Sequence, residues 1–208
     1  MNTPADKPAP IDFYFDFVSP FGYFASLRID ALAEKYGREV EWHSMLLGVS
    51  VLKVMGSKPL LSVPLKGDYL RRDVARYKRR HGLVLARKSD DPMMDSRWCG
   101  RAFHWVKAHL PGREKALARA LYQAYWVEGR DLGTPQAAAA AVATAGFDAA
   151  MLEEEIRNDD AGRLLRSAVE ESMKRGVFGS PTFVVDGELF WGMDTLSTVE
   201  DWLARGGW

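Results

Sequence analysis

Residues 11–22 of the chain read IDFYFDFVSPFG, and this stretch decides the fold. Its first seven residues alternate large apolar and polar side chains, a pattern typical of a strand with at least one buried face. Ser19-Pro20 then indicates a helix start. A serine hydroxyl can cap a free backbone N–H, and a proline at the first helical position has no N–H to satisfy. We therefore predict a strand that runs directly into a helix capped by Ser19.

Ser19 has two interpretations. A serine at a helix start lies among unpaired N–H groups at the positive end of the helix, where a thiolate, phosphate or carboxylate is stabilised. Most Ser-Pro helix starts, however, use the serine only as a cap. These residues alone leave both interpretations open.

The composition excludes several classes of function. The 208 residues are 47% hydrophobic and 12% aromatic, which is ample for a core. Equal numbers of basic and acidic residues, 28 of each, give no electrostatic reason to expect nucleic-acid binding. No run of eighteen apolar residues occurs, so we expect no membrane segment. Residues 1–10 contain three prolines and no apolar core, and they predict a loose tail.

Cysteine and histidine usage narrows the chemistry. Cys99 is the single cysteine, which excludes an intramolecular disulfide or a Cys-x-x-Cys redox pair and makes the cytoplasm the expected compartment. His104 and His109 are five residues apart and do not share a helix face, so no metal site is predicted. A hydrolase triad built on Ser19 stays open as another class, although the chain has no Gly-x-Ser-x-Gly elbow.

The rest of the chain divides into two sheet-forming parts around a helical block. After one helix from Ser19 to Tyr36, residues 39–47 predict a second strand, parallel to the first. A basic helix is expected at about 68–81, and the pattern is helical from 95 to about 176. Asp186-Gly187 between two apolar runs predicts a tight hairpin, and residues 195–204 predict a final helix.

This order of elements, with an X-Pro pair just before the hairpin, resembles the thioredoxin fold. Its helical insertion is similar to that of DsbA-like proteins. Within that group the chain resembles the family of kappa-class glutathione transferases and 2-hydroxychromene-2-carboxylate isomerases. The motifs that carry the resemblance are DFYFDFVSPF at 12–21, GSKP at 56–59, Lys66-Gly67 with Tyr69, GVFGSPTF at 176–183 and FWGMD at 190–194.

The resemblance implies an α/β fold of thioredoxin type with a large all-helical insertion. The thioredoxin-like domain would comprise residues 11–47 and 177–208, with a bridging helix at 159–176. Residues 48–176 would form the mostly helical inserted domain. A cis peptide bond is expected between Ser180 and Pro181, facing the start of the first helix. A homodimer is expected from the family alone.

The resemblance also implies glutathione as cofactor. Ser19 matches the serine that activates the glutathione thiol, and the remaining glutathione contacts would be Ser57, Lys66, Ser180, Pro181, Asp194 and Thr195. Ser57 replaces the asparagine usual in the family and has a shorter side chain. The expected pocket for the second substrate consists of Phe17, Phe21, Tyr23 and Trp126, although core packing is an alternative for each of them.

Two uses of the glutathione thiolate follow from the family. An isomerase would convert a hydroxychromene carboxylate to trans-o-hydroxybenzylidenepyruvate in aromatic degradation, and a transferase would conjugate an electrophile. The DFVSPF wording at 16–21 and the stretch around Tyr125-Trp126 favour the isomerase branch. A non-catalytic glutathione- or peptide-binding protein of the same fold is the third possibility.

Overall fold

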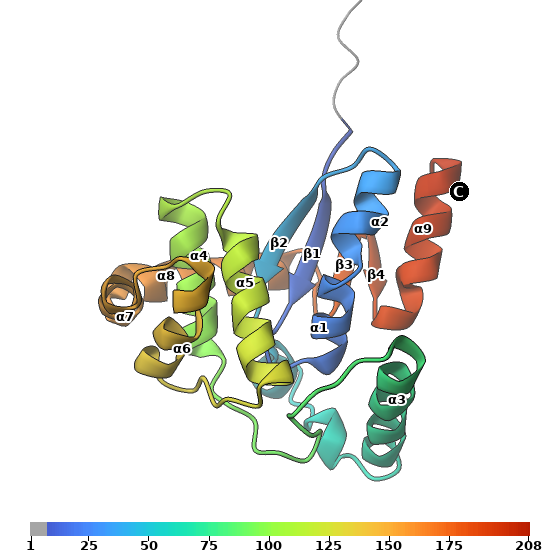
Figure 1. The fold of residues 1–208 in the computed structure, drawn as a ribbon. Coiled ribbons are helices and arrows are strands. Elements are labelled where there is room, and N and C mark those ends of the chain that lie inside the picture. Colours follow the sequence, from blue (N-terminus) through green and yellow to red (C-terminus); the bar gives the residue numbers. More distant parts are fainter. Residues whose placement is uncertain (1–7) are drawn as a thin grey trace, which may run out of the picture.

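A four-stranded mixed sheet forms the centre of the computed structural model, which describes residues 8–208 apart from the side chain of Leu52 (Figure 1). Residues 1–7 of the predicted tail lie outside the described residues. The strands are β1 (Ile11–Phe15), β2 (Val40–Ser44), β3 (Thr182–Val185) and β4 (Glu188–Trp191), in the order β2-β1-β3-β4. β1 pairs parallel with β2 and antiparallel with β3, which confirms the predicted joining of the two halves.

Buried aromatic side chains fix the register of the sheet. Phe13 lies opposite Trp42 on one side and Phe183 on the other, and all three side chains are buried. Asp186 and Gly187 join β3 to β4 with φ angles of 52° and 91°. These positive values are those of the tight hairpin turn that the Asp-Gly pair predicts.

The first helix is interrupted, contrary to the prediction of one helix as far as Tyr36. α1 (Pro20–Ser26) ends at Ser26, and α2 (Ile29–Lys35) begins after Arg28. The buried Ser26 hydroxyl donates to the backbone carbonyl of Tyr23 at 2.6 Å, a local bond that competes with helix continuation. α1 and α2 lie in front of the sheet in Figure 1, α9 (Leu196–Arg205) lies beside β4, and α8 (Asp159–Lys174) passes behind.

The second strand is also shorter than the predicted range of 39–47. It ends at Ser44, and the Leu47 backbone N–H donates to the Asp16 carboxylate at 2.8 Å instead of continuing the ladder. Two short segments follow, the π-helical η1 (Gly48–Val54) and the 3₁₀ turn η2 (Leu60–Ser62). α3 (Lys66–His81) then begins two residues before the predicted basic helix.

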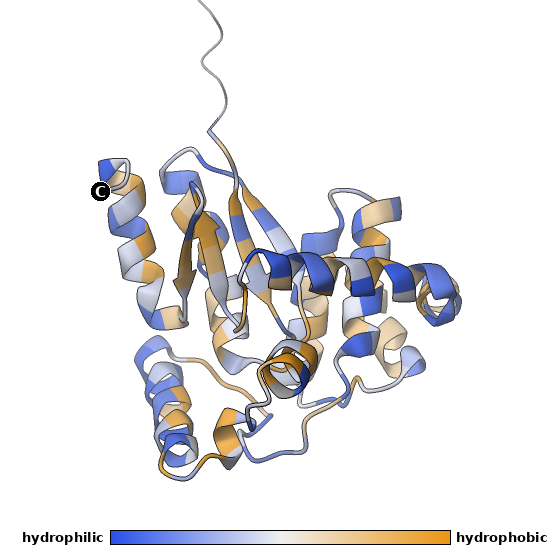
Figure 2. Cartoon of the chain, turned by 180° about the vertical axis from the view of Figure 1, so that it is seen from behind, coloured by the Kyte–Doolittle hydropathy of each residue, from blue (hydrophilic) through white to orange (hydrophobic). Residues whose placement is uncertain are grey.

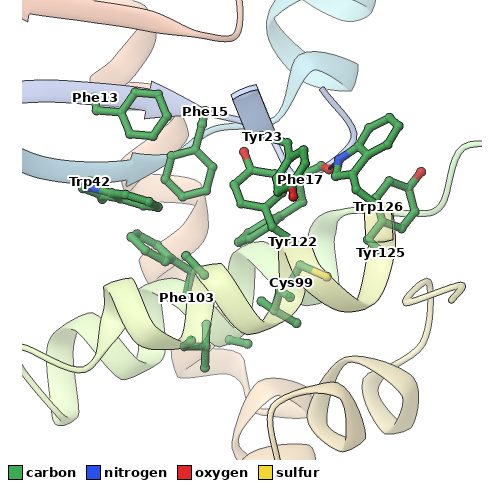
Figure 3. Close-up of a cluster of buried hydrophobic side chains, with 14 of the residues drawn as sticks. Phe13, Phe15, Phe17, Tyr23, Trp42, Cys99, Phe103, Tyr122, Tyr125 and Trp126 are labelled. Carbon is green, nitrogen blue, oxygen red and sulfur yellow. Dashed lines mark hydrogen bonds between the residues drawn. The ribbon is translucent and has the colours of Figure 1, made fainter. Parts of the chain in front are cut away.

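The helical block packs onto the sheet through a shared aromatic core (Figure 3). Phe15 of β1 contacts Phe103 and Tyr122, with ring centroids 5.4 and 5.6 Å apart. The remaining elements of the block are α4 (Arg97–His109), α5 (Glu114–Tyr122), η3 (Gln123–Val127), α6 (Pro135–Ala141), η4 (Ala143–Ala145) and α7 (Ala149–Arg157). The two predicted domains therefore share one hydrophobic core.

Hydropathy follows this packing. Seen from behind, β3 is mostly hydrophobic, whereas β2 and α8 carry many hydrophilic residues (Figure 2). Within residues 8–208, no helix combines the length and the apolar character needed to cross a membrane.

Candidate functional site

Ser19 caps α1, as its position before Pro20 predicts. Its backbone is extended, and its Oγ accepts a hydrogen bond from the Gly22 N–H at 3.1 Å. The same hydroxyl donates to the backbone carbonyl of Ser180 at 3.0 Å. Ser19 is only 5% exposed, so the residue is buried.

The Ser180-Pro181 loop faces the start of α1. The peptide bond between these residues is cis, as the resemblance predicts. The Ser180 Oγ accepts from the Asp16 N–H at 3.0 Å, and the Pro181 carbonyl accepts from the Gly192 N–H at 2.9 Å. The loop is therefore bonded to the end of β1 on one side and to the segment before α9 on the other.

A buried carboxylate holds the segment that leads into Ser19. Asp16 is 1% exposed and accepts from the N–H groups of Leu47 and Val18 at 2.8 and 3.3 Å. Burial raises the pKa of the Asp16 carboxyl above its usual range, although these hydrogen bonds favour the charged form. The sequence reasoning assigned no role to Asp16; the signal was a carboxylate among apolar residues at the end of a buried strand.

Two aromatic side chains of the helical block bind the same segment. The Tyr122 hydroxyl donates to the Asp16 carbonyl at 3.3 Å, and the Trp126 indole N–H donates to the Phe17 carbonyl at 3.0 Å. Both side chains are buried (Figure 3). The insertion thus fixes the backbone immediately before Ser19.

A groove of about 1290 Å³ lies between α1, α2, α3 and the start of α9. It brings together five of the predicted residues: Phe21, Lys66, Ser180, Pro181 and Asp194. A cation, a carboxylate and the cis-proline loop therefore line one depression. These groups match the carboxylate, ammonium and amide groups of a small peptide.

The other predicted residues do not line this groove. Ser57 is exposed elsewhere, and the Thr195 hydroxyl donates to the Gly192 carbonyl at 2.8 Å. Phe17, Tyr23 and Trp126 belong to the buried core. Ser19 does not line the groove, but its hydroxyl donates to the carbonyl of Ser180, which does.

Cys99 is buried in the core, and burial raises the pKa of its thiol, so it is not poised to act as a nucleophile. In the described part of the chain, no group of three or more histidine, cysteine, aspartate or glutamate side chains could hold a metal ion.

Comparison with known proteins gives a consistent result. Residues 10–204 match the family described as the DSBA-like thioredoxin domain. A 2-hydroxychromene-2-carboxylate isomerase of Pseudomonas putida is 28% identical over 198 residues, which cover 94% of each chain. Another protein of that name, from Sphingobium xenophagum, is 28% identical and covers 93% of this chain and 97% of its own. A solved 2-hydroxychromene-2-carboxylate isomerase superposes with a TM-score of 0.81 at 27% identity, over 94% of both chains.

Proposed function

Because the chain belongs to the DsbA-like thioredoxin domain family, we propose that it is a glutathione-dependent isomerase of the 2-hydroxychromene-2-carboxylate type. The reaction would convert a hydroxychromene carboxylate to trans-o-hydroxybenzylidenepyruvate. The names and the coverage of the relatives support the isomerase class. The names of these relatives do not mention glutathione, and the cofactor is part of our proposal.

One observation carries the proposal: the Ser19 hydroxyl contacts the Ser180 carbonyl in the loop that lines the groove. Residues 19–22 are Ser-Pro-Phe-Gly and contain no cysteine, so the chain cannot itself exchange a dithiol with a disulfide at this position. A hydroxyl suits a different task, namely donating a hydrogen bond to a thiolate that a bound molecule supplies.

The side chains of the groove fit glutathione. Lys66 would pair with the glycyl carboxylate and Asp194 with the γ-glutamyl ammonium, and both side chains are exposed in the groove. Thr195 and Ser57, which do not line the groove, are proposed as further contacts on the resemblance alone. When bound, glutathione supplies a thiolate that adds reversibly to the conjugated ring-opened substrate, allows rotation about the bond that has become single, and is then eliminated.

The hydrogen bonds of Ser19 suggest how it takes part. In this structure its hydroxyl hydrogen is directed to the Ser180 carbonyl. An amide N–H that occupies this carbonyl would release the hydroxyl hydrogen, which could rotate toward a sulfur. Ser19 would still accept from the Gly22 N–H, and this bond holds the oxygen in place.

The size of the effect is sufficient for the task. A charge-assisted hydrogen bond contributes roughly 1.5–3 kcal/mol. Since one pKa unit corresponds to about 1.4 kcal/mol, Ser19 could lower the pKa of a bound thiol by one or two units. A larger fraction of thiolate would then be present near neutral pH.

A paired assay tests the proposal. Purified protein is given 2-hydroxychromene-2-carboxylate with glutathione, with S-methylglutathione, or alone, and product is followed by absorbance. We expect turnover with glutathione only. In parallel, 1-chloro-2,4-dinitrobenzene with glutathione reports conjugation. Conjugation without isomerisation would mean that the protein is a transferase and not an isomerase. Turnover that does not need glutathione would contradict the proposed cofactor.

A further inference from the structure

Helix α3 separates two depressions of the surface. One of its faces lines the groove described above, through residues that include Lys66, Tyr69, Tyr77 and Arg80. The other face lines a second groove of about 500 Å³, through residues that include Lys78 and Arg79. Arg79 and Arg80 are therefore neighbours in sequence that line different grooves.

The acidic side chains of the first groove are mostly paired. Asp73 forms an ion pair with Arg76 at 2.7 Å, and Glu200 forms one with Lys35 at 2.7 Å. The charge of Arg28 also acts on Glu200. By contrast, none of the interactions described for residues 8–208 gives the Arg80 guanidinium a hydrogen bond or an ion pair. Arg80 is thus a cation in the groove without a partner in the described chain.

The groove is longer than a tripeptide. Lys66 and Arg80 are fourteen residues apart on α3, which corresponds to about 21 Å at 1.5 Å per residue. Three extended residues span about 11 Å at most. A tripeptide held at Lys66 would therefore leave the part of the groove near Arg80 free for another group.

Aromatic and aliphatic side chains line this part together with Arg28 and His81. Tyr77 lies one turn before Arg80, and its ring packs against both Phe24 and His81, with centroids 4.3 and 4.2 Å away, which holds it in place. Leu27 and Leu32 line the facing wall. In Figure 1, α3 lies close to α1 and the start of α9, the elements that form the other walls.

We propose that Arg80, together with the apolar wall formed by Tyr77, Leu27 and Leu32, forms a subsite for a planar aromatic carboxylate. A guanidinium pairs with a carboxylate through two parallel hydrogen bonds, and the apolar wall accepts the ring. This inference rests on the proposed function in one respect, since the carboxylate would be that of the substrate.

The test measures binding rather than turnover. Salicylate and its neutral analogue salicylamide are titrated into the protein, with S-methylglutathione present, and followed by NMR. We expect Arg80→Ala to raise the Kd of salicylate about tenfold, which corresponds to about 1.4 kcal/mol. Arg79→Ala is the matched control and should leave it unchanged. Arg80→Lys keeps the charge, so its Kd for salicylate should lie between those of Arg79→Ala and Arg80→Ala. Arg80 is exposed, so these variants should melt at the wild-type temperature.

The outcomes separate the two proposals. Equal salicylate affinity in the Arg80→Ala and Arg79→Ala variants, or equal affinity of wild type for salicylate and salicylamide, would overturn the subsite. If salicylate binds through Arg80 but glutathione supports no turnover, the subsite stands and the proposed function fails. If glutathione-dependent turnover occurs and the Kd of salicylate does not change in Arg80→Ala, the proposed function stands and the subsite fails.

Discussion

The Ser19 hydroxyl donates to the Ser180 carbonyl at 3.0 Å, although the two residues lie 161 positions apart in the sequence. Ser19 follows β1 and Ser180 precedes β3, and these two strands pair directly. The contact therefore depends on the antiparallel pairing that closes the sheet across the helical block. It also links the cap of α1 to the loop that lines the groove.

We expect Ser19→Ala to lower glutathione-dependent turnover about a hundredfold, the range seen when a single donor to a developing charge is removed. The variant also loses its helix cap, which should lower the free energy of unfolding by about 1 kcal/mol. Steady-state kinetics and denaturant unfolding measure the two effects separately. Turnover close to that of wild type would disprove the catalytic role of Ser19.

Thr134→Ala is a control that separates the loss of a helix cap from the loss of the proposed catalytic hydroxyl. Thr134 also precedes a proline, and its hydroxyl accepts from the Ala137 N–H at 3.2 Å at the start of α6. This variant should lose a similar amount of stability while keeping wild-type turnover. If both variants lose activity equally, loss of stability alone explains the Ser19 result.

Asp194→Ala should raise the Kd of glutathione about tenfold by calorimetry, because the proposed contact to the γ-glutamyl ammonium is lost. Glu200→Ala is the control: Glu200 lines the same groove, but it is paired with Lys35. We expect the affinity of that variant to be unchanged. A similar loss in both variants would mean that the overall charge of the groove, not Asp194, determines binding.

Local signals predicted the framework of the site. Ser19-Pro20 predicted a capped helix start and Asp186-Gly187 a hairpin, because each depends on the conformations available to two adjacent residues. The interruption after Ser26 was missed, because it coincides with a side-chain bond to Tyr23 that apolar spacing does not reveal. The early end of β2 was missed for a related reason, since Leu47 bonds to the carboxylate of Asp16, which follows β1.

Side-chain direction was the main limit on predicting the site. Phe17, Phe21 and Tyr23 follow one another around Ser19, yet only Phe21 lines the groove. Trp126 comes from the helical block and bonds to the Phe17 carbonyl, so it supports the site from within the core. Which of several aromatic residues faces a groove depends on packing between distant segments, and a single sequence does not contain this information.

His104 should make the protein sensitive to acid. It is buried and contacts the Ser44 carbonyl through Nε2 at 2.8 Å, and burial lowers its pKa to about 4. Because the folded value lies below the unfolded value of about 6.5, its contribution is present above pH 6.5 and is lost as the pH falls toward 4. The loss amounts to roughly 3 kcal/mol. His104→Gln should remove this dependence when unfolding free energies are compared at pH 7, 5 and 4. An equally steep fall in the variant would mean that other groups cause it.

The contribution of Asp16 to the free energy of unfolding should change with pH in the opposite direction to that of His104. Burial raises the pKa of its carboxyl in the folded chain, so its contribution is complete below about pH 4 and is lost as the pH rises through the folded value. The free energy of unfolding of wild type, minus that of Asp16→Asn, should therefore fall with rising pH, by at most about 1.4 kcal/mol per pH unit. Denaturant unfolding of both proteins from pH 4 to 8 measures this difference, and His104 cancels because both proteins contain it. A difference that grows with pH would show that the hydrogen bonds from Leu47 and Val18 outweigh burial and keep Asp16 charged beside Ser19.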